Sequence, residues 1–188
     1  MAIKVGVVSV QGDFEKHLQK VAESGHEGCE IRSPEDLSGV THVILPGGES
    51  TTVGLLLRRY GLGSALIDFA NAGKPIWGTC MGMILMAAKI EKYDQYSLGL
   101  LDITVRRNAF GAQVHSFETP IAMVGMQEPV MGVFIRAPIV TEHSDSVEVL
   151  ATFDGQTVAV RQGNRVGTSF HPELAQGTAF LDWYLSLK

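Results

Sequence analysis

The chain has 188 residues, of which 45% are hydrophobic and 19% are charged, and its formal net charge is −5. These values, with no low-complexity or hinge-like stretch, predict one soluble domain over residues 1–188 with a substantial core. The acidic balance and the lack of a basic run argue against nucleic acid or an anionic membrane as a partner. No apolar run approaches the roughly 20 residues that span a bilayer, and the N-terminus lacks a signal-peptide pattern.

The positions of the cysteines and histidines indicate whether disulfides or metal sites are to be expected. The two cysteines, Cys29 and Cys80, are far apart in the sequence, which fits a reducing compartment, so we expect a cytoplasmic protein without a disulfide. Most histidines are scattered without the spacing of metal ligands. We therefore expect no metal site and no cofactor.

The first half of the chain alternates predicted strands and helices. In chain order we expect a strand over 3–10, a helix in which Phe14, Leu18 and Val21 share one face, a short strand over 30–32, a strand over 43–45, helices over 53–60 and from 64 to about 73, and a strand over 75–77. A helical apolar pattern then covers 83–87. Such alternation favours a three-layer α/β sandwich with a mostly parallel central sheet, in which ligands bind at the carboxyl ends of the strands.

The second half is richer in strands. We expect strands over 103–107, 120–124, 133–136, 147–153, 158–161 and 166–170. A terminal helix carrying Phe180, Leu181, Tyr184 and Leu185 is expected to pack back onto the sheet.

The most informative motif is Gly78-Thr79-Cys80-Met81-Gly82, which lies between a predicted strand and a predicted helix. Small residues around a nucleophile allow a sharp strand-to-helix turn that exposes its side chain, with the following amide directed to the same space. The positive end of the helix would also favour the thiolate. A buried structural cysteine is the alternative.

A nucleophilic thiol needs a base and a group that orients the base. His171 and Glu173 supply both if the chain stays extended through them, because residues two apart in a strand project to the same face. A surface ion pair is the alternative. A zinc-deaminase reading of the motif fails, because no later pair of cysteines follows.

A glycine-rich loop, Pro46-Gly47-Gly48-Glu49-Ser50-Thr51, follows the strand that ends at Leu45. Its exposed amides suit the oxyanion of a tetrahedral intermediate, with the Met81 amide as a second donor. A phosphate cradle is weaker, since no Lys-Ser/Thr pair follows the glycines. We also expect Ser50 or Thr51 to cap the next helix.

These three elements, in this order, resemble the triad glutamine amidotransferases. The resemblance extends to the glutaminase subunits of pyridoxal 5′-phosphate synthase, and it spans nearly the whole chain. Five strings carry it: 46–51 (PGGEST), 78–80 (GTC), 107–111 (RNAFG), 134–138 (FIRAP) and 169–174 (SFHPEL). The resemblance implies a flavodoxin-like class I glutamine amidotransferase fold with extra strands in the second half.

The resemblance also implies the activity and the partner. The chain would hydrolyse L-glutamine to L-glutamate and ammonia through a glutamyl thioester, and pass the ammonia to a synthase subunit that builds vitamin B6. Cys80 would be the nucleophile, His171 the general base and acid, and Glu173 the residue that orients His171. Gly48 and Met81 would form the oxyanion hole, and the glutamine site would comprise Gly47, Gly48, Glu49, Arg107, Ile135 and Arg136. Two arginines suit the α-carboxylate of glutamine.

The chain departs from the family pattern at Met81, Met83, Ala112 and residues 175–178, which affects details of docking but not the triad. Two other functions stay open at this stage. One is a free-standing hydrolase of γ-glutamyl amides, and the other is a non-enzymatic sensor in which Cys80 is an oxidisable thiol.

Overall fold

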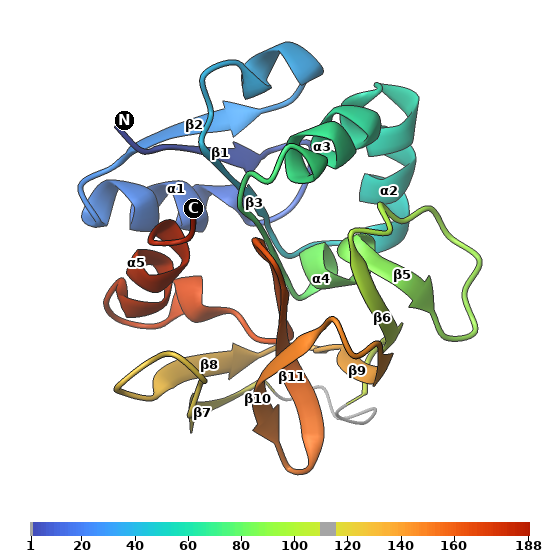
Figure 1. The fold of residues 1–188 in the computed structure, drawn as a ribbon, viewed down its shortest axis with the longest axis vertical. Coiled ribbons are helices and arrows are strands. Elements are labelled where there is room, and N and C mark those ends of the chain that lie inside the picture. The colour runs from blue at the N-terminus through green and yellow to red at the C-terminus, as the bar shows by residue number, and fades with distance from the viewer. Residues whose placement is uncertain (1, 110–115) are drawn as a thin grey trace.

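A long twisted sheet runs through the molecule and carries helices on both faces (Figure 1). The computed structural model describes residues 2–109 and 116–188. Phe110 and Gly111 of the third family string, and Ala112, lie outside the described residues.

The sheet has a parallel half and a second half that is mostly antiparallel, with β5 and β6 paired in parallel at its edge. Its strand order is β2 (Glu27–Ile31), β1 (Lys4–Val8), β3 (His42–Leu45), β4 (Ile76–Thr79), β12 (Arg165–Thr168), β11 (Gln156–Gln162), β9 (Ile139–His143), β6 (Leu101–Arg106) and β5 (Ala87–Ile90). The run from β2 to β12 is parallel, whereas β11 is antiparallel to β12, β9 and β10 (Glu148–Phe153). A separate antiparallel ribbon joins β7 (Phe117–Ile121) to β8 (Val130–Phe134).

The helices form the two outer layers of the parallel half. On one face lie α1 (Phe14–Glu23) and α5 (Ala179–Leu185), and on the other lie α2 (Ser50–Arg59), α3 (Leu62–Asn71) and α4 (Met81–Met86) (Figure 1). The described residues also contain two short 3-10 turns, η1 (Pro34–Leu37) and η2 (Pro172–Leu174). The three-layer arrangement with helices on both faces confirms the predicted fold class.

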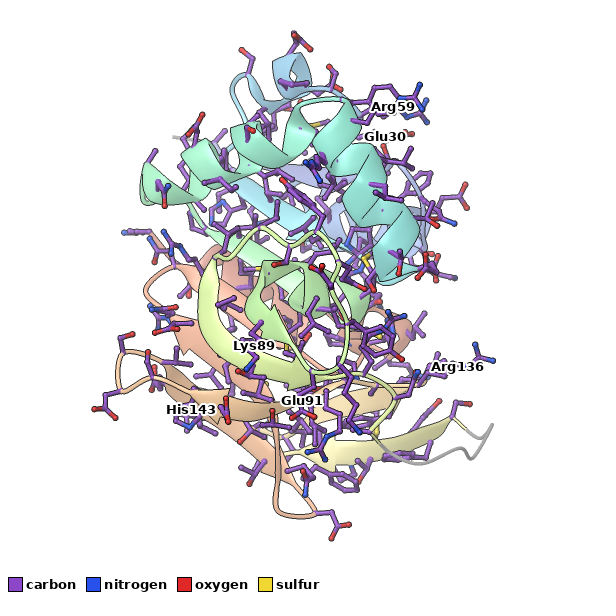
Figure 2. The ribbon with its side chains drawn as sticks, turned by 90° about the vertical axis from the view of Figure 1, so that its right-hand side faces the viewer. Glu30, Arg59, Lys89, Glu91, Arg136 and His143 are labelled. Carbon is purple, nitrogen blue, oxygen red and sulfur yellow. The ribbon has the colours of Figure 1, made fainter. Side chains whose placement is uncertain are left out.

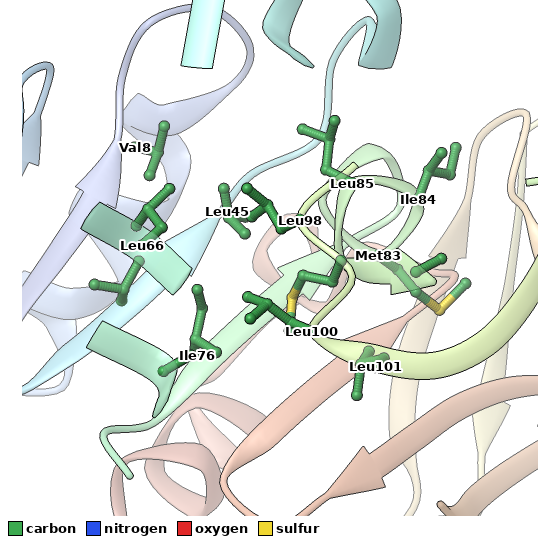
Figure 3. Packing of buried hydrophobic residues seen from close by; sticks show 14 of the residues in the cluster. Val8, Leu45, Leu66, Ile76, Met83, Ile84, Leu85, Leu98, Leu100 and Leu101 are labelled. Carbon is green, nitrogen blue, oxygen red and sulfur yellow. The ribbon is translucent and has the colours of Figure 1, made fainter. Parts of the chain in front are cut away.

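The core is divided by the sheet into two apolar clusters, because successive strand residues point to opposite faces. In β3, Val43 and Leu45 join the cluster under α2 and α3, whereas Ile44 joins the cluster under α1 and α5. In β4, Ile76 and Trp77 divide in the same way. Figure 3 shows part of the first cluster, with Leu45 and Ile76 among its members. The inner strands of the parallel half are therefore buried on both sides, as expected for such a sheet, whereas the edge strand β2 is largely exposed.

Two strands escape sequence prediction. The apolar helical pattern ends one residue early, at Met86, and Ala87 instead begins β5, which pairs with β6. This part of the prediction is wrong because periodicity cannot distinguish a short buried strand from the end of a helix. The strand β9 pairs with β6 along its length, and its β-branched start was the local signal that could have revealed it.

Other predicted strands in the second half end earlier in the structure than in the sequence analysis. The strand β8 ends at Phe134, so Ile135 and Arg136 lie beyond it, and β12 ends at Thr168 rather than at residue 170. These shifts place functional candidates in the connections after strands, where side chains are free to converge.

Within residues 2–109 and 116–188, no helix has the length and apolar character needed to cross a bilayer. Among the same residues, no group of three or more histidine, cysteine, aspartate or glutamate side chains is arranged to hold a metal ion.

Tyr184 joins the terminal helix to the centre of the sheet. Its side chain is fully buried, and its hydroxyl lies 2.7 Å from the carbonyl oxygen of Val43 and 3.0 Å from that of Pro75. Burial raises the pKa of this hydroxyl well above its usual value, so it remains a donor.

We predict that Tyr184→Phe lowers the free energy of unfolding by about 1–3 kcal/mol, because it removes the donor from buried carbonyls. Urea denaturation followed by circular dichroism measures the change. The exposed Tyr60 provides the matched control, and Tyr60→Phe should stay within about 0.5 kcal/mol of the wild type. Equal stability of the two variants would show that the Tyr184 hydroxyl contributes nothing.

Candidate active site

A cleft of about 800 Å³ opens at the carboxyl ends of β3 and β4. Its lining comprises Asp13, Gly47, Gly48, Glu49, Ser50, Cys80, Met81, Ile84, Arg107, Asn108, Ile135, Arg136, His171 and Leu174. The structure thus gathers around one cleft every candidate residue of the sequence analysis except Glu173, which lies behind His171. Asp13, Ser50, Ile84, Asn108 and Leu174 are lining residues that the sequence analysis did not assign.

Cys80 occupies a sharp turn between β4 and α4. Its φ is +51°, an unfavourable value for a residue with a side chain. The turn is held from both sides: the Cys80 amide donates to the Thr168 carbonyl at 2.7 Å, and the Cys80 carbonyl accepts from the Ile84 amide at 3.2 Å. A strained backbone fixed by neighbouring strands is what a nucleophile elbow requires.

Gly82 allows α4 to lie directly against the end of β3. A Cβ atom at this position would stand 2.1 Å from the Leu45 carbonyl oxygen, which is far inside van der Waals contact. The second glycine of the motif is therefore needed for the close approach of helix and strand. Because Met81 is the first residue of α4, its amide has no acceptor within the helix.

His171 and Glu173 form a buried pair beside Cys80. The Nδ1 atom of His171 lies 2.7 Å from Oε1 of Glu173, and Glu173 is only 4% exposed. The predicted contact between the two side chains exists, but the extended backbone that was predicted from His171 to Glu173 is wrong. The chain leaves β12 at Thr168 and Glu173 belongs to the 3-10 turn η2, so the two side chains meet across a turn rather than along a strand.

The electrostatics of this pair favour charge on both members. Burial by itself would lower the pKa of His171, but the Cys80 sulfur and the Glu173 carboxylate outweigh it and raise the pKa to about 10. Burial would likewise raise the pKa of Glu173, yet the imidazoles of His17 and His171 hold it well below its usual range. The arrangement therefore supports a protonated imidazole bound to an ionised carboxylate.

Gly47 brings the glycine-rich loop onto the imidazole. A Cβ atom at Gly47 would lie 2.5 Å from Cε1 of His171, so a larger residue would displace either the loop or the ring. The loop, the elbow and the histidine thus form one packed unit.

Glu49 caps the helix that follows the loop, a role that the sequence analysis gave to Ser50 or Thr51. Its carboxylate accepts the Thr51 amide at 3.0 Å and the Thr52 amide at 2.7 Å. The Thr52 amide is the strongest influence on this group, and together these bonds lower the pKa of Glu49 to about 2. The prediction of the capping residue is wrong because the longer glutamate side chain reaches both free amides of the first turn.

Arg107 is held at the cleft by a segment that the sequence analysis left unassigned. Its guanidinium lies 4.6 Å from the Tyr93 ring centroid, and Nη1 donates to Oε1 of Gln95 at 3.0 Å. Nη2 is 3.7 Å from Oε1 of Glu49. Arg106, the last residue of β6, instead pairs with Glu91, with Nε 3.0 Å from Oε2.

Ile135 and Arg136 follow the end of β8. The Cys80 sulfur lies 3.8 Å from the Ile135 carbonyl oxygen, so this backbone forms a wall next to the nucleophile. Arg136 has a left-handed φ of +47° and is exposed. Its side chain extends outward at the edge of the molecule (Figure 2).

His17 is a buried contact of Glu173 that the sequence analysis did not assign. Its side chain is 1% exposed, and Nε2 lies 3.3 Å from Oε1 of Glu173. The available signal was its position four residues before Val21, on the apolar face of the predicted helix. A polar ring on such a face calls for a partner.

Comparison with known proteins assigns the chain to a family. The sequence model of the SNO glutamine amidotransferase family matches residues 7–187. The chain belongs to this family. It is 46% identical over 185 residues to "Pyridoxal 5'-phosphate synthase subunit PdxT" of Geobacillus kaustophilus, covering 98% of this chain and 94% of that protein. The protein of the same name from Clostridium beijerinckii is 46% identical over 187 residues, covering 99% and 98%.

Solved structures agree with this assignment. A crystal structure of a glutamine amidotransferase matches with a TM-score of 0.92 and 42% identity, covering 96% of each chain. The structure of PurLQS from Thermotoga maritima matches with a TM-score of 0.70 and 20% identity, covering 97% of this chain and 99% of that one. The second likeness concerns the fold alone.

We predict that Glu173→Gln lowers the pKa of His171 below its value of about 10, because a neutral amide no longer stabilises the imidazolium. An NMR titration of the ¹⁵N-labelled imidazole measures the change. Glu128 is exposed, and Glu128→Gln serves as the control that should leave the titration unchanged. An unaltered midpoint in the Glu173 variant would mean that the carboxylate does not govern the charge of His171.

Proposed function

We propose that this family member hydrolyses L-glutamine with Cys80, His171 and Glu173 and supplies the released ammonia to a pyridoxal 5′-phosphate synthase subunit. The observation that carries the catalytic part is the convergence of a strained cysteine and a carboxylate-bound histidine at one cleft. The shared name of the relatives, subunit of that synthase, carries the part about the partner.

The first half of the reaction forms a thioester. The Cys80 thiolate attacks the side-chain carbonyl carbon of glutamine, and the carbonyl oxygen becomes an oxyanion. Amides of Gly48 and Met81, which line the cleft, would donate to that oxyanion, and such donors contribute about 3 kcal/mol each to transition-state stabilisation. His171 gives its proton to the leaving nitrogen, the C–N bond breaks, and ammonia departs.

The second half returns the enzyme to its starting state. His171, now neutral, takes a proton from water as the water oxygen attacks the thioester carbon. The C–S bond breaks, glutamate leaves, and Cys80 and His171 again form the thiolate and imidazolium. Glu173 keeps Nδ1 of His171 protonated and directed away from the cleft throughout, so the other ring nitrogen serves the reaction.

Charged residues at the rim of the cleft would bind the α-carboxylate of the glutamine substrate. Arg107, which Tyr93 and Gln95 hold in place, suits the α-carboxylate, and the exposed Arg136 would join it only by turning its side chain toward the cleft. The Ile135 backbone would bound the site beside the sulfur. Gly47, Gly48 and Glu49 also line the cleft.

Docking of the synthase subunit is supported at the mouth of this cleft. Ile135 and Leu174 are 41% and 37% exposed, and both line the cleft. Large apolar side chains exposed beside a reactive centre are typical of surfaces that a partner covers.

We predict that Cys80→Ala abolishes glutamate release from L-glutamine while leaving the fold intact, because no other group supplies the nucleophile. Enzyme-coupled glutamate detection measures the rate, and circular dichroism checks the fold. The matched control is Cys29→Ala, which removes the other free cysteine and should retain the wild-type rate. Residual turnover by the Cys80 variant would contradict the mechanism.

We also predict that adding the synthase subunit from the same source raises the rate of glutamate release several-fold. Steady-state assays with and without that subunit test this. Equal rates would indicate a free-standing amidase. Absence of activity in both, with γ-glutamyl peptides also left intact, would return Cys80 to the role of an oxidisable thiol.

A further inference from the structure

The carboxylate of Glu173 lies between two imidazoles, and only one of them faces the cleft. His171 lines the cleft, whereas His17 and Glu173 line a smaller cavity of about 90 Å³ on the other side. His17 comes from α1, and its ring meets the Trp77 ring edge-on at 5.2 Å. The proposed mechanism uses His171 and gives His17 no role.

One ring nitrogen of each imidazole lies close to the same carboxylate oxygen. Oε1 of Glu173 is 2.7 Å from Nδ1 of His171 and 3.3 Å from Nε2 of His17. A nitrogen lone pair at 3.3 Å would repel the carboxylate, so a role for His17 at Glu173 requires a proton on Nε2.

The contact with His17 is close enough for charge interaction but is not aligned as a hydrogen bond. Among the residues that the structure describes, neither His17 Nε2 nor Glu173 Oε2 has a hydrogen-bond partner. An ionised carboxylate that is 4% exposed must be compensated by its surroundings. The imidazole of His171 contacts the carboxylate from the cleft, and the imidazole of His17 contacts it from the cavity.

The other charged groups nearby are already engaged. On the cleft side, the Cys80 sulfur acts on His171. On the cavity side, the Lys20 ammonium is 3.1 Å from a Glu23 carboxylate oxygen and 3.1 Å from the Gly177 carbonyl oxygen. His17 is therefore the group on α1 that is directed at the Glu173 carboxylate.

We propose that His17 is a positioning residue that keeps the Glu173 carboxylate ionised and aligned on His171 during glutamine hydrolysis. This inference rests on the proposed function of the triad. His17 does not touch the substrate in this scheme and acts only through Glu173. Loss of its N–H would leave the carboxylate free to rotate or to take up a proton, and either change would misorient the catalytic imidazole.

The test compares two substitutions in the complex with the synthase subunit. His17→Phe keeps a ring against Trp77 but removes the donor, whereas His17→Gln keeps an N–H near the position of Nε2. We expect His17→Phe to lower kcat about tenfold to a hundredfold, the loss that accompanies a displaced catalytic group, with KM within about twofold of the wild type. His17→Gln should recover most of the rate.

A pH profile separates this role from simple packing. In His17→Phe, Glu173 should take up its proton more readily, so the acid limb of kcat/KM should move to higher pH. The matched control is His42, another buried histidine, whose ring meets Tyr184 edge-on at 5.5 Å. His42→Phe should leave kcat and the acid limb unchanged, even if it lowers the melting temperature.

Two results would overturn the proposal. One is a folded His17→Phe protein with wild-type kcat and pH profile. The other is an equal loss in the Phe and Gln variants with no movement of the acid limb, which would make His17 a packing residue. If His17→Phe does not fold, ¹⁵N NMR of the wild-type histidines decides, since an unprotonated Nε2 on His17 at neutral pH would contradict the proposal.

Failure of this inference is distinct from failure of the proposed function. The wild-type protein and Cys80→Ala are assayed alongside the His17 variants. An inactive wild type, or an active Cys80 variant, would remove the triad mechanism itself. An active wild type with an unaffected His17→Phe would remove only the role of His17.

Discussion

The parallel pairing of β4 with β12 is the constraint on which the rest of the site depends. It places Thr79 opposite Thr168, so the chain that turns at Cys80 and the chain that continues to His171 start from adjacent points. Side chains reinforce the junction: Trp77 Nε1 donates to the Thr168 hydroxyl at 3.0 Å, and the Thr79 hydroxyl donates to the Phe170 carbonyl at 2.8 Å. Because these groups are buried, displacing one strand relative to the other would leave several donors unsatisfied. Nucleophile and base are therefore held together by the interior of the sheet rather than by mobile loops.

The charges of the site are arranged across layers of the fold. Cys80 and His171 come from the ends of central strands, Glu173 from the turn after β12, and His17 from the helix on the far face. A buried carboxylate costs several kcal/mol unless polar groups surround it. The imidazoles of His171 and His17 are the polar groups that lie against Glu173. The packing of α1 onto the sheet thus has an electrostatic consequence at the site, in addition to burying its apolar face.

The rim of the cleft is formed by loops, whereas its base lies at the ends of central strands. Arg107 leaves the end of β6 and is held by Tyr93 and Gln95, which belong to the connection after β5. Solved structures of low sequence identity share the fold, with TM-scores of 0.70. The loops that connect strands can vary in sequence without disturbing a buried sheet. Proteins of this fold can therefore differ at the rim in the ligands or partner proteins that they bind.

The sequence by itself determined the alternation of strands and helices in the first half of the chain. It also determined the elbow at Cys80, the glycine-rich loop and the pairing of His171 with Glu173. These features have local signals: apolar periodicity, glycines beside a nucleophile, and a carboxylate two residues from an imidazole. Only the tertiary structure decided that Glu173 lies in a 3-10 turn, that Glu49 caps α2, and that Gln95 and His17 contact functional groups. Those contacts join residues distant in the chain or depend on how far a side chain reaches. Neither spacing nor composition encodes such distances, because they are set by how the layers pack.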